Sequence, residues 1–186
     1  MAKGINIEAD IKRAERLLSL SSRGARVAAK RAINKVAGPA KTAASKGIRK
    51  QRNLRAADIK RDLRLQRASG RSMTAFIEAR RRPVPLHKFR GTRQLKKGLR
   101  VEQVPGQKSV WRNAFQPWGK GTPVFRRTGR SAYPIQFQVG PTIASALDKD
   151  ATRRAIDQSI TSRWPRLFRH EIEREIAKAR RRSGGG

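Results

Sequence analysis

The chain has 186 residues, of which 46 are Lys or Arg and 13 are Asp or Glu, so its formal net charge is +33. A charge of this size opposes compaction of an isolated protein and favours a polyanionic partner. The absence of cysteine excludes disulfides, thiolate metal sites and cysteine nucleophiles.

The first 68 residues are predicted to form a basic helical region. From Asn6 to Leu20 apolar residues recur at helical spacing, and two acidic residues occupy the first turn, where they favour a helix start. A second helix from Ser22 to Ile48 carries Ala and Val along one stripe, so another backbone can approach it closely. Because Pro39 lies within this helix and removes one hydrogen bond, we expect a kink or two helices that meet there.

A dense run of cations extends from Lys46 to Arg67 and exceeds what Asp58 and Asp62 can pair. Most charge runs are solvated helix faces, but this excess favours contact with phosphates. The run lacks a recognition helix with Asn, Gln or Ser at base-reading positions. Sequence-specific reading of DNA is therefore not expected.

Residues 69–141 are predicted to form an antiparallel β-meander of five to six short strands, because the apolar period changes from helical to two-residue. Residues 90–98 are expected to be a flexible basic loop, and Pro105 with Gly106 a turn. Strands are expected around residues 73–78, 86–89, 99–102, 110–115, 124–127 and 133–139, and Pro83-Val84-Pro85 is expected to adopt an extended or edge conformation.

The stretch from Ala114 to Pro141 has the clearest pattern. In its last strand Tyr133, Ile135, Phe137 and Val139 should point to one side, with glutamines on the other. The Gly-Lys-Gly-Thr tract at residues 119–122 lacks the spacing of a phosphate loop and joins two strands, so it is expected to be a hairpin turn.

Residues 142–182 are predicted to form helices packed on the sheet, with an acidic residue before residue 151 as the cap and an interruption at Trp164-Pro165. Residues 183–186 are expected to be a flexible tail. The fold class is therefore α+β, in one structural domain. The chain has no run of roughly 18 apolar residues and no apolar segment at its start, which predicts a protein made in the cytoplasm without membrane association.

Catalytic chemistry has little support in the residues. His87 and His170 lie in different segments, and neither has metal-ligand spacing to another ligand. Glu171 and Glu175 lie one turn apart in the last helix, where salt bridges to Arg174 and Lys178 are the ordinary explanation. We expect no enzyme activity, catalytic residue, cofactor, metal or small-molecule substrate; a metal-dependent nuclease is the least favoured alternative.

Several stretches, in this order, resemble the minor tail protein Z family of tailed bacteriophages, also called tail completion proteins. They are AAKRAINKVAGPAKTAASKGIRKQRNL, IKRDLRL, PLHKF, KKGLRVEQVPG, NAFQPWGKGTPVFRRTGRSAYPI and VGPTIA, within residues 25 to 145. Two departures are Gly38-Pro39 within a helix and Pro-Trp near the hairpin tip. None of the matching pieces is a catalytic motif, so the resemblance indicates a structural role.

The resemblance implies a virion component at the head-proximal end of the tail, which joins tail to head and places the genome end in the channel. It implies a ring of six copies in contact with tail terminator, tail tube or head-tail connector proteins. A ring this basic could hold double-stranded DNA through its phosphates without reading sequence. The alternative function is a free basic nucleic-acid-binding protein of ribosomal or DNA-packaging type.

Two sets of candidate residues follow. Candidates for polyanion or DNA contact are Lys46, Arg49, Lys50, Arg52, Arg55, Lys60, Arg61, Arg64, Arg80, Arg81, Arg82, Arg126, Arg127 and Arg130. Candidates for contact between subunits or rings are Phe115, Trp118, Lys120, Phe125, Tyr133 and Phe137. The aromatic residues among them are better explained by core and interface than by base stacking, with Trp118 left open.

Overall fold

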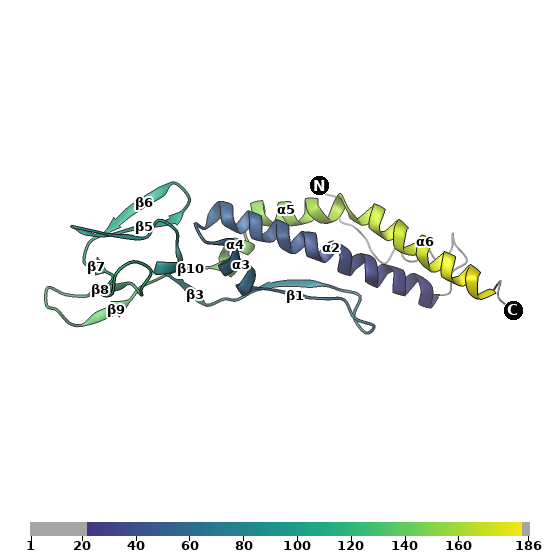
Figure 1. The fold of residues 1–186 in the computed structure, drawn as a ribbon, viewed down its shortest axis with the longest axis horizontal. Helices are drawn as coiled ribbons and strands as arrows, with labels where there is room; N and C mark the ends of the chain where they lie inside the picture. Colours follow the sequence, from purple (N-terminus) through teal and green to yellow (C-terminus); the bar gives the residue numbers. More distant parts are fainter. Residues whose placement is uncertain (1–21, 184–186) are drawn as a thin grey trace. The chain divides into compact units, whose positions relative to one another are not determined.

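A computed structural model describes residues 22–183 of the chain, so the helix expected from Asn6 to Leu20 lies outside the described residues. Helices and short antiparallel strands confirm the predicted α+β class (Figure 1). The elements are α2 (Ser22–Gln51), α3 (Ala56–Asp62), β1 (Leu63–Gln66), β2 (Phe76–Ala79), β3 (Pro83–Pro85), the 3-10 helix η1 (Leu86–Lys88), β4 (Arg93–Leu95), β5 (Gly98–Val104), β6 (Gln107–Trp111), β7 (Ala114–Phe115), β8 (Phe125–Arg127), β9 (Ile135–Phe137), β10 (Val139–Thr142), α4 (Ile143–Leu147), α5 (Asp150–Thr161) and α6 (Trp164–Ser183).

Contacts divide the described residues into two compact units. The helical unit comprises residues 22–42, 65–77 and 156–183, and the strand unit comprises residues 43–64 and 78–155.

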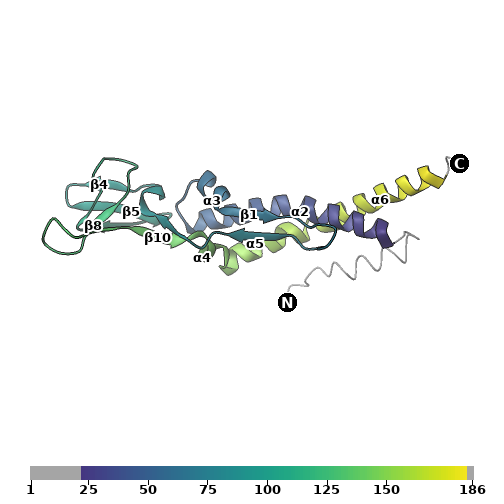
Figure 2. The same ribbon diagram turned by 90° about the horizontal axis from the view of Figure 1, so that it is seen from below.

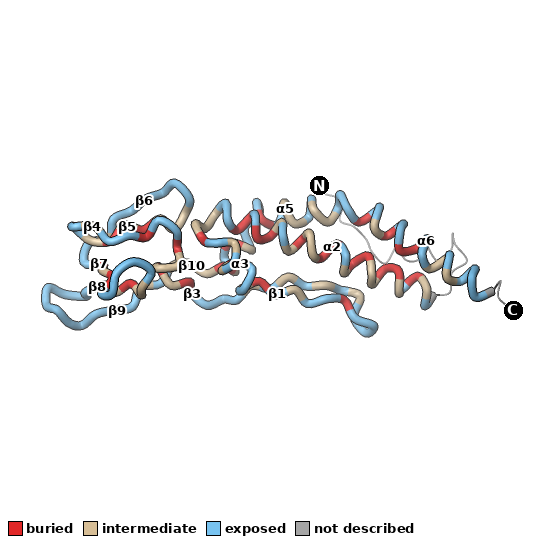
Figure 3. Tube along the Cα trace, in the orientation of Figure 1, coloured by how far each residue is buried: buried red, intermediate tan, exposed pale blue. Residues whose placement is uncertain are grey.

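The core of the helical unit lies between the small-residue stripe of α2 and the apolar stripe of α6 (Figures 1 and 3). Ala28, Ala29 and Ala32 are fully buried there, and the rings of Trp164 and Phe168 stack with their centroids 5.0 Å apart. Small side chains let the large α6 rings approach the α2 backbone, as the sequence predicts. The partners of α6 in this core are α2, Ile160 of α5 and the connection between β1 and β2.

Helix α2 runs through Gly38 and Pro39 as one element. Of the two alternatives expected at Pro39, two separate helices is therefore wrong, and a kink stays a prediction. A proline removes one backbone donor, and the surrounding helix retains its other hydrogen bonds. Val36 and Ala40 are buried on either side of the pair, and the Thr42 hydroxyl donates to the Gly38 carbonyl at 3.3 Å. Burial on both sides of Pro39 holds the helix together.

The β1–β2 hairpin begins within the stretch predicted to be helical, since residues 63–66 form β1. Its connection is tied to α2 by Asn34, whose side chain donates to the Ala68 carbonyl at 3.0 Å and accepts from the Ala68 amide at 2.8 Å. The alternation expected from Met73 to Glu78 is confirmed, because half-buried and exposed residues alternate from Met73 to Arg80.

Small antiparallel sheets dominate the strand unit (Figure 2). Two of them are three-stranded, with orders β4-β5-β6 and β7-β8-β9, and β10 pairs with β3 in a third. Leu99 and Val101 of β5 are fully buried, as are Leu86 and Val124. The edge character predicted for Pro83-Val84-Pro85 agrees with its position in a two-stranded sheet.

Three local predictions in this unit are wrong. Residues 86–88 form η1 instead of a strand, and the loop expected at residues 90–98 contains β4. The strand expected at residues 110–115 is divided into β6 and β7, because Asn113 adopts a φ of 63°, a left-handed conformation that ends β6.

The alternating residues Tyr133, Ile135, Phe137 and Val139 remain exposed, at 75%, 38%, 43% and 41% of their surface. The pattern therefore predicts a strand, β9, but not the burial that such a pattern normally accompanies. In Figure 3 β9 and the preceding loop are coloured as exposed.

Helix α5 packs on the C-terminal end of α2 within the strand unit. A Cβ placed on Gly47 would lie 3.0 Å from the Thr152 methyl group, so glycine permits this approach. The Gln51 amide donates to the Thr152 hydroxyl at 2.7 Å. Helix α5 begins at Asp150, and the break before Trp164 is confirmed.

Candidate functional site

The predicted polyanion-contact residues lie on two stretches and one hairpin of the strand unit. They occupy the end of α2, α3 and β1; the segment between β2 and β3; and β8 with the loop that follows it. All of them except Arg52 are exposed. Arg80 is connected to the α3 segment through its backbone amide, which donates to the Asp62 carbonyl at 3.0 Å.

Few of these cations form ion pairs. Arg61 lies 3.7 Å from Asp58 and Arg80 lies 3.8 Å from Asp62, and these pairs are at the surface, where they are weak. Within the described residues the other candidates take part in no ion pair. Most of their charge therefore remains available to a partner.

Arg52 has a different environment from the rest. It is half-buried, and its guanidinium donates to the Gln51 carbonyl at 3.4 Å and to the Ser145 hydroxyl at 3.3 Å. Burial lowers its pKa from the ordinary value. These contacts suit an arginine that joins α2 to α4 better than one that meets a polyanion.

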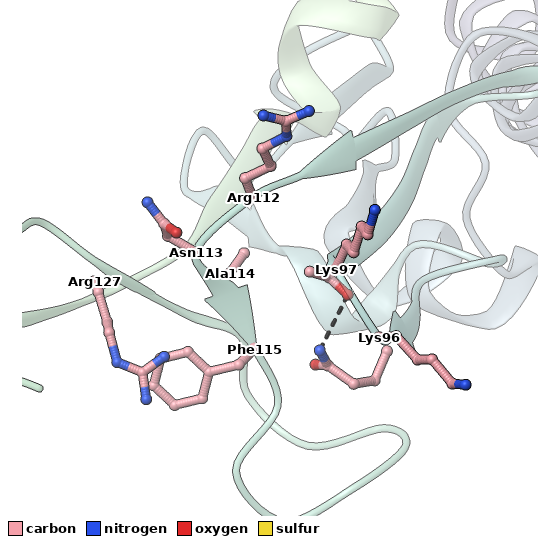
Figure 4. A pocket seen from close by; sticks show the side chains of 9 residues that line it. Lys96, Lys97, Arg112, Asn113, Ala114, Phe115 and Arg127 are labelled. Atoms are coloured by element: carbon pink, nitrogen blue, oxygen red, sulfur yellow. Dashed lines mark hydrogen bonds between the residues drawn. The ribbon is translucent and has the colours of Figure 1, made fainter. Parts of the chain in front are cut away.

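A pocket of about 530 Å³ opens between the two three-stranded sheets (Figure 4). Four cations from three segments line it: Lys96 and Lys97 from the β4–β5 turn, Arg112 from the β6–β7 connection, and Arg127 from β8. The lining contains no carboxylate. None of these four cations forms an ion pair with any residue the structure describes, so the pocket is suited to an anionic group.

The β4–β5 turn is held in place by one side chain. The Gln94 amide group donates to the Leu95 carbonyl at 3.1 Å and to the Gly98 carbonyl at 3.0 Å. The side-chain oxygen Oε1 of Gln94 accepts a hydrogen bond from the backbone N–H of Gln116 at 3.1 Å, which ties this turn to the end of β7. The two walls of the pocket are thereby fixed relative to one another.

Gly98 completes this arrangement through its conformation. Its φ is +123°, and a Cβ there would lie 2.5 Å from the Trp111 carbonyl oxygen. Only glycine combines this backbone geometry with so close a contact. The turn that carries Lys96 and Lys97 therefore depends on this residue.

The guanidinium of Arg127 lies over the Phe115 ring, with its central carbon 4.4 Å from the ring centroid (Figure 4). The Arg127 amide donates to the Asn113 carbonyl at 3.0 Å. Stacking on an aromatic ring leaves the edge of the guanidinium and its N–H groups able to bind an anion. Arg126 pairs with Ala114 and so lies on the opposite face of β8.

The predicted interface aromatics form one row across the β7-β8-β9 sheet. Phe115 is opposite Phe125, and Phe125 is opposite Phe137, with ring centroids 6.4 and 5.9 Å apart. Trp118 meets Phe125 edge-on at 6.2 Å and is 71% exposed. The structure thus brings four of the six interface candidates together. Lys120 and Tyr133 are exposed in the loops before and after β8.

The acidic residues of α6 form ion pairs, as the sequence predicts, but with α2 as well as within α6. Glu171 is fully buried and paired with Lys35 and, at 3.9 Å, with Arg174. Glu175 is paired with Arg31 and, at 3.1 Å, with Lys178. Partial burial acts to raise the pKa of Glu175, but the Lys178 hydrogen bond and both cations outweigh burial and lower it. No group of metal-ligating side chains occurs in residues 22–183.

His87 is half-buried in η1. Burial lowers its pKa, the charge of Lys88 lowers it further, and Asp58 acts in the opposite direction. His87 lies in the strand unit and His170 in the helical unit.

Sequence reasoning did not select Lys96, Lys97 and Arg112 as site residues. The first two were assigned to a flexible loop, and Arg112 was placed in the middle of a strand. The signal that could have found them is the Lys-Lys-Gly order, in which glycine permits a tight turn between strands. Their approach to Arg127 depends on how the two sheets pack.

Comparison with known proteins gives one result. Neither curated proteins nor solved structures yield a match to the chain. Within the described part of the chain no helix has the length and apolarity to cross a bilayer. The model of one family, described as prophage minor tail protein Z (GPZ), matches residues 9–182. Since this match covers nearly the whole sequence, the chain belongs to the prophage minor tail protein Z family of phage tail structural proteins.

Proposed function

We propose that the protein completes the tail at its head-proximal end and joins tail to head as a ring of six copies. Membership of the minor tail protein Z family supports a structural role in the virion. Tail terminator, tail tube or head-tail connector proteins are the neighbours that this position provides.

The observation that carries the proposal is the excess of exposed cations without counter-charge. From Lys46 to Arg64 and from Arg80 to Arg82 only two surface ion pairs are formed within the described residues. Several copies side by side would present a large positive surface to the genome end. Contact of this kind neutralises phosphates and needs no base reading.

The test of the position is imaging of intact particles by cryo-electron microscopy, with the subunits counted in the averaged density. We expect a ring of this chain where tail meets head. Density that accounts for the chain elsewhere in the particle, or a chain missing from purified particles, would overturn the proposal.

The phosphate contact has its own test in the purified protein. The triple substitution of Arg55, Lys60 and Arg64 by Gln should reduce the salt dependence of duplex binding, since each lost phosphate contact lowers the slope by about 0.9. Arg153→Gln is the matched control, because Arg153 is exposed and already paired with Asp148 at 3.3 Å. If the salt dependence of duplex binding has the same slope in the control and in the triple variant, this surface does not contact phosphates.

A net charge of +33 also favours the second candidate, a free nucleic-acid-binding protein. That function predicts tight binding by the isolated monomer and no place in the particle. Detection of the ring by imaging would exclude it.

A further inference from the structure

We propose that an extended acidic segment of a neighbouring protein binds the strand unit across the basic pocket and the adjacent aromatic row. We call this surface the aromatic–basic face, and it consists of Lys96, Lys97, Arg112, Phe115, Trp118, Phe125, Arg127, Ile135 and Phe137. The inference rests on the proposed function only in requiring that the chain has protein neighbours.

The strand register places the pocket and the aromatic row on one continuous surface. Residues opposite one another in antiparallel strands share a face, as do residues two apart along a strand. Phe125 and Arg127 are two apart on β8, and Arg127 is opposite Ile135. Because Arg127 and Phe115 also line the pocket, the surface extends from the pocket to the outer strand β9.

The charge on this surface is not balanced by the chain itself. Four cations line the pocket without a carboxylate among the lining residues. An anionic partner would neutralise these cations. A second copy of this chain carries only 13 acidic residues against 46 basic ones, so an acidic segment of another protein suits this surface better.

The apolar part of the surface favours a protein over a nucleic acid. Ile135 and Phe137 are 38% and 43% exposed, and Trp118 is 71% exposed. Exposed aromatic groups beside arginine are typical of the residues that bind most strongly in protein interfaces. A phosphate backbone would neutralise the lysines but would leave these apolar groups in water.

The ring geometry also disfavours base stacking. Phe125 meets Trp118 and Phe137 at interplanar angles of 83° and 61°, and one face of Phe115 is covered by Arg127. A stacking platform needs open ring faces that are parallel to the incoming base. This cluster contacts its neighbours edge to face and suits the side chains of a peptide.

The position of β9 explains why the segment should be extended. β9 is the outer strand in the order β7-β8-β9, and no described strand pairs with its other edge. An extended segment can hydrogen-bond along such an edge while its alternate side chains point to one face. Acidic and apolar side chains that take turns at every second position of the segment would then share one face, where Arg127 and the aromatic row lie.

The experiment measures binding of a labelled synthetic peptide to the full chain by fluorescence anisotropy. Glu and Phe take turns at every second position of this peptide, with Ser between them, so that both kinds of side chain lie on one face of the extended peptide. A peptide with Gln in place of Glu and a single-stranded oligonucleotide provide the comparisons. The test variants are Lys97→Gln combined with Arg127→Gln, and Phe137→Ser, with Ile135→Ser as a second apolar variant. The matched controls are Lys108→Gln and Val110→Ser, since both residues are exposed on β6 in the same unit. Thermal unfolding verifies that each variant is folded.

We expect the Glu peptide to bind more tightly than the Gln peptide, and each test variant to weaken its binding at least about tenfold, as for residues central to an interface. The controls should leave its affinity unchanged. Equal binding of the two peptides, or equal effects of test and control variants, would overturn the proposal. Tighter binding of the oligonucleotide, lost in the same test variants, would identify a nucleic-acid site instead. None of these outcomes depends on where the chain lies in the particle, so imaging can fail while the peptide result stands.

Discussion

Removing the Lys35 ammonium should destabilise the helical unit, because it deprives a buried carboxylate of its main counter-charge. The side chain of Glu171 is fully buried, whereas that of Lys35 is 44% exposed. After a Lys35→Met substitution the remaining ion-pair partner is Arg174, whose guanidinium nitrogen lies 3.9 Å from the carboxylate.

The magnitude follows from this geometry. Loss of one partner from a fully buried ion pair costs about 3–5 kcal/mol. Water screens the exposed part of the Lys35 charge and Arg174 remains, so we expect a loss of about 2 kcal/mol. For a chain of this size 1 kcal/mol corresponds to a melting-temperature shift of about 2–4 °C, which gives a decrease of about 4–8 °C.

A second substitution tests the cause. Combining Lys35→Met with Glu171→Leu removes the buried charge, and the new leucine lies beside the apolar residues Phe168 and Ile172 of α6. Replacement of a buried ion pair by apolar groups is often neutral or stabilising, so the double variant should be more stable than Lys35→Met alone. Urea unfolding and thermal melts followed by circular dichroism measure both. A double variant as unstable as the sum of the single variants would refute the reasoning.

Three further predictions concern stability. Gly98→Ala should lower the free energy of unfolding in urea by about 1–3 kcal/mol, because both the positive φ of Gly98 and the Trp111 carbonyl oppose a side chain. Gly129→Ala is the control and should change stability by less than about 0.5 kcal/mol, because a Cβ there would have no atom within 4 Å. Equal effects of the two substitutions would contradict this. The pKa of His87 is lowered from 6.5, so the stability that this residue contributes is complete above pH 6.5 and is lost as pH falls through the lower native pKa. His87→Gln should therefore flatten the pH dependence of the unfolding free energy in that window. An unchanged pH profile would argue against this. The pKa of Glu175 is lowered from 4.5, so the stability that this carboxylate contributes is complete above pH 4.5 and is lost as pH falls through the native pKa. Glu175→Gln should be less stable than the original chain at neutral pH, and this difference should shrink in acid. Unfolding curves at a series of pH values would reveal or exclude this change.

Patterns confined to one element were predicted reliably, because local periodicity determines which side of an element is apolar. The small-residue stripe of α2, the stripe of α6 and the break before Trp164 are all present in the structure. Predictions failed where a local conformation interrupts a pattern. The left-handed Asn113, for example, divides β6 from β7. The opposite case is Pro39, where α2 continues through the proline with buried residues on both sides.

The sequence by itself determined the α+β class, the excess of positive charge and membership of the minor tail protein Z family, since these depend on residue types and their order. Only the tertiary structure decided which cations line one pocket. Lys96, Lys97, Arg112 and Arg127 come from three segments that meet because Gln94 and the strand register fix two sheets side by side. Likewise the alternation at Ile135 and Phe137 gives no sign of exposure, because burial depends on what another part of the chain covers, and no described element covers β9.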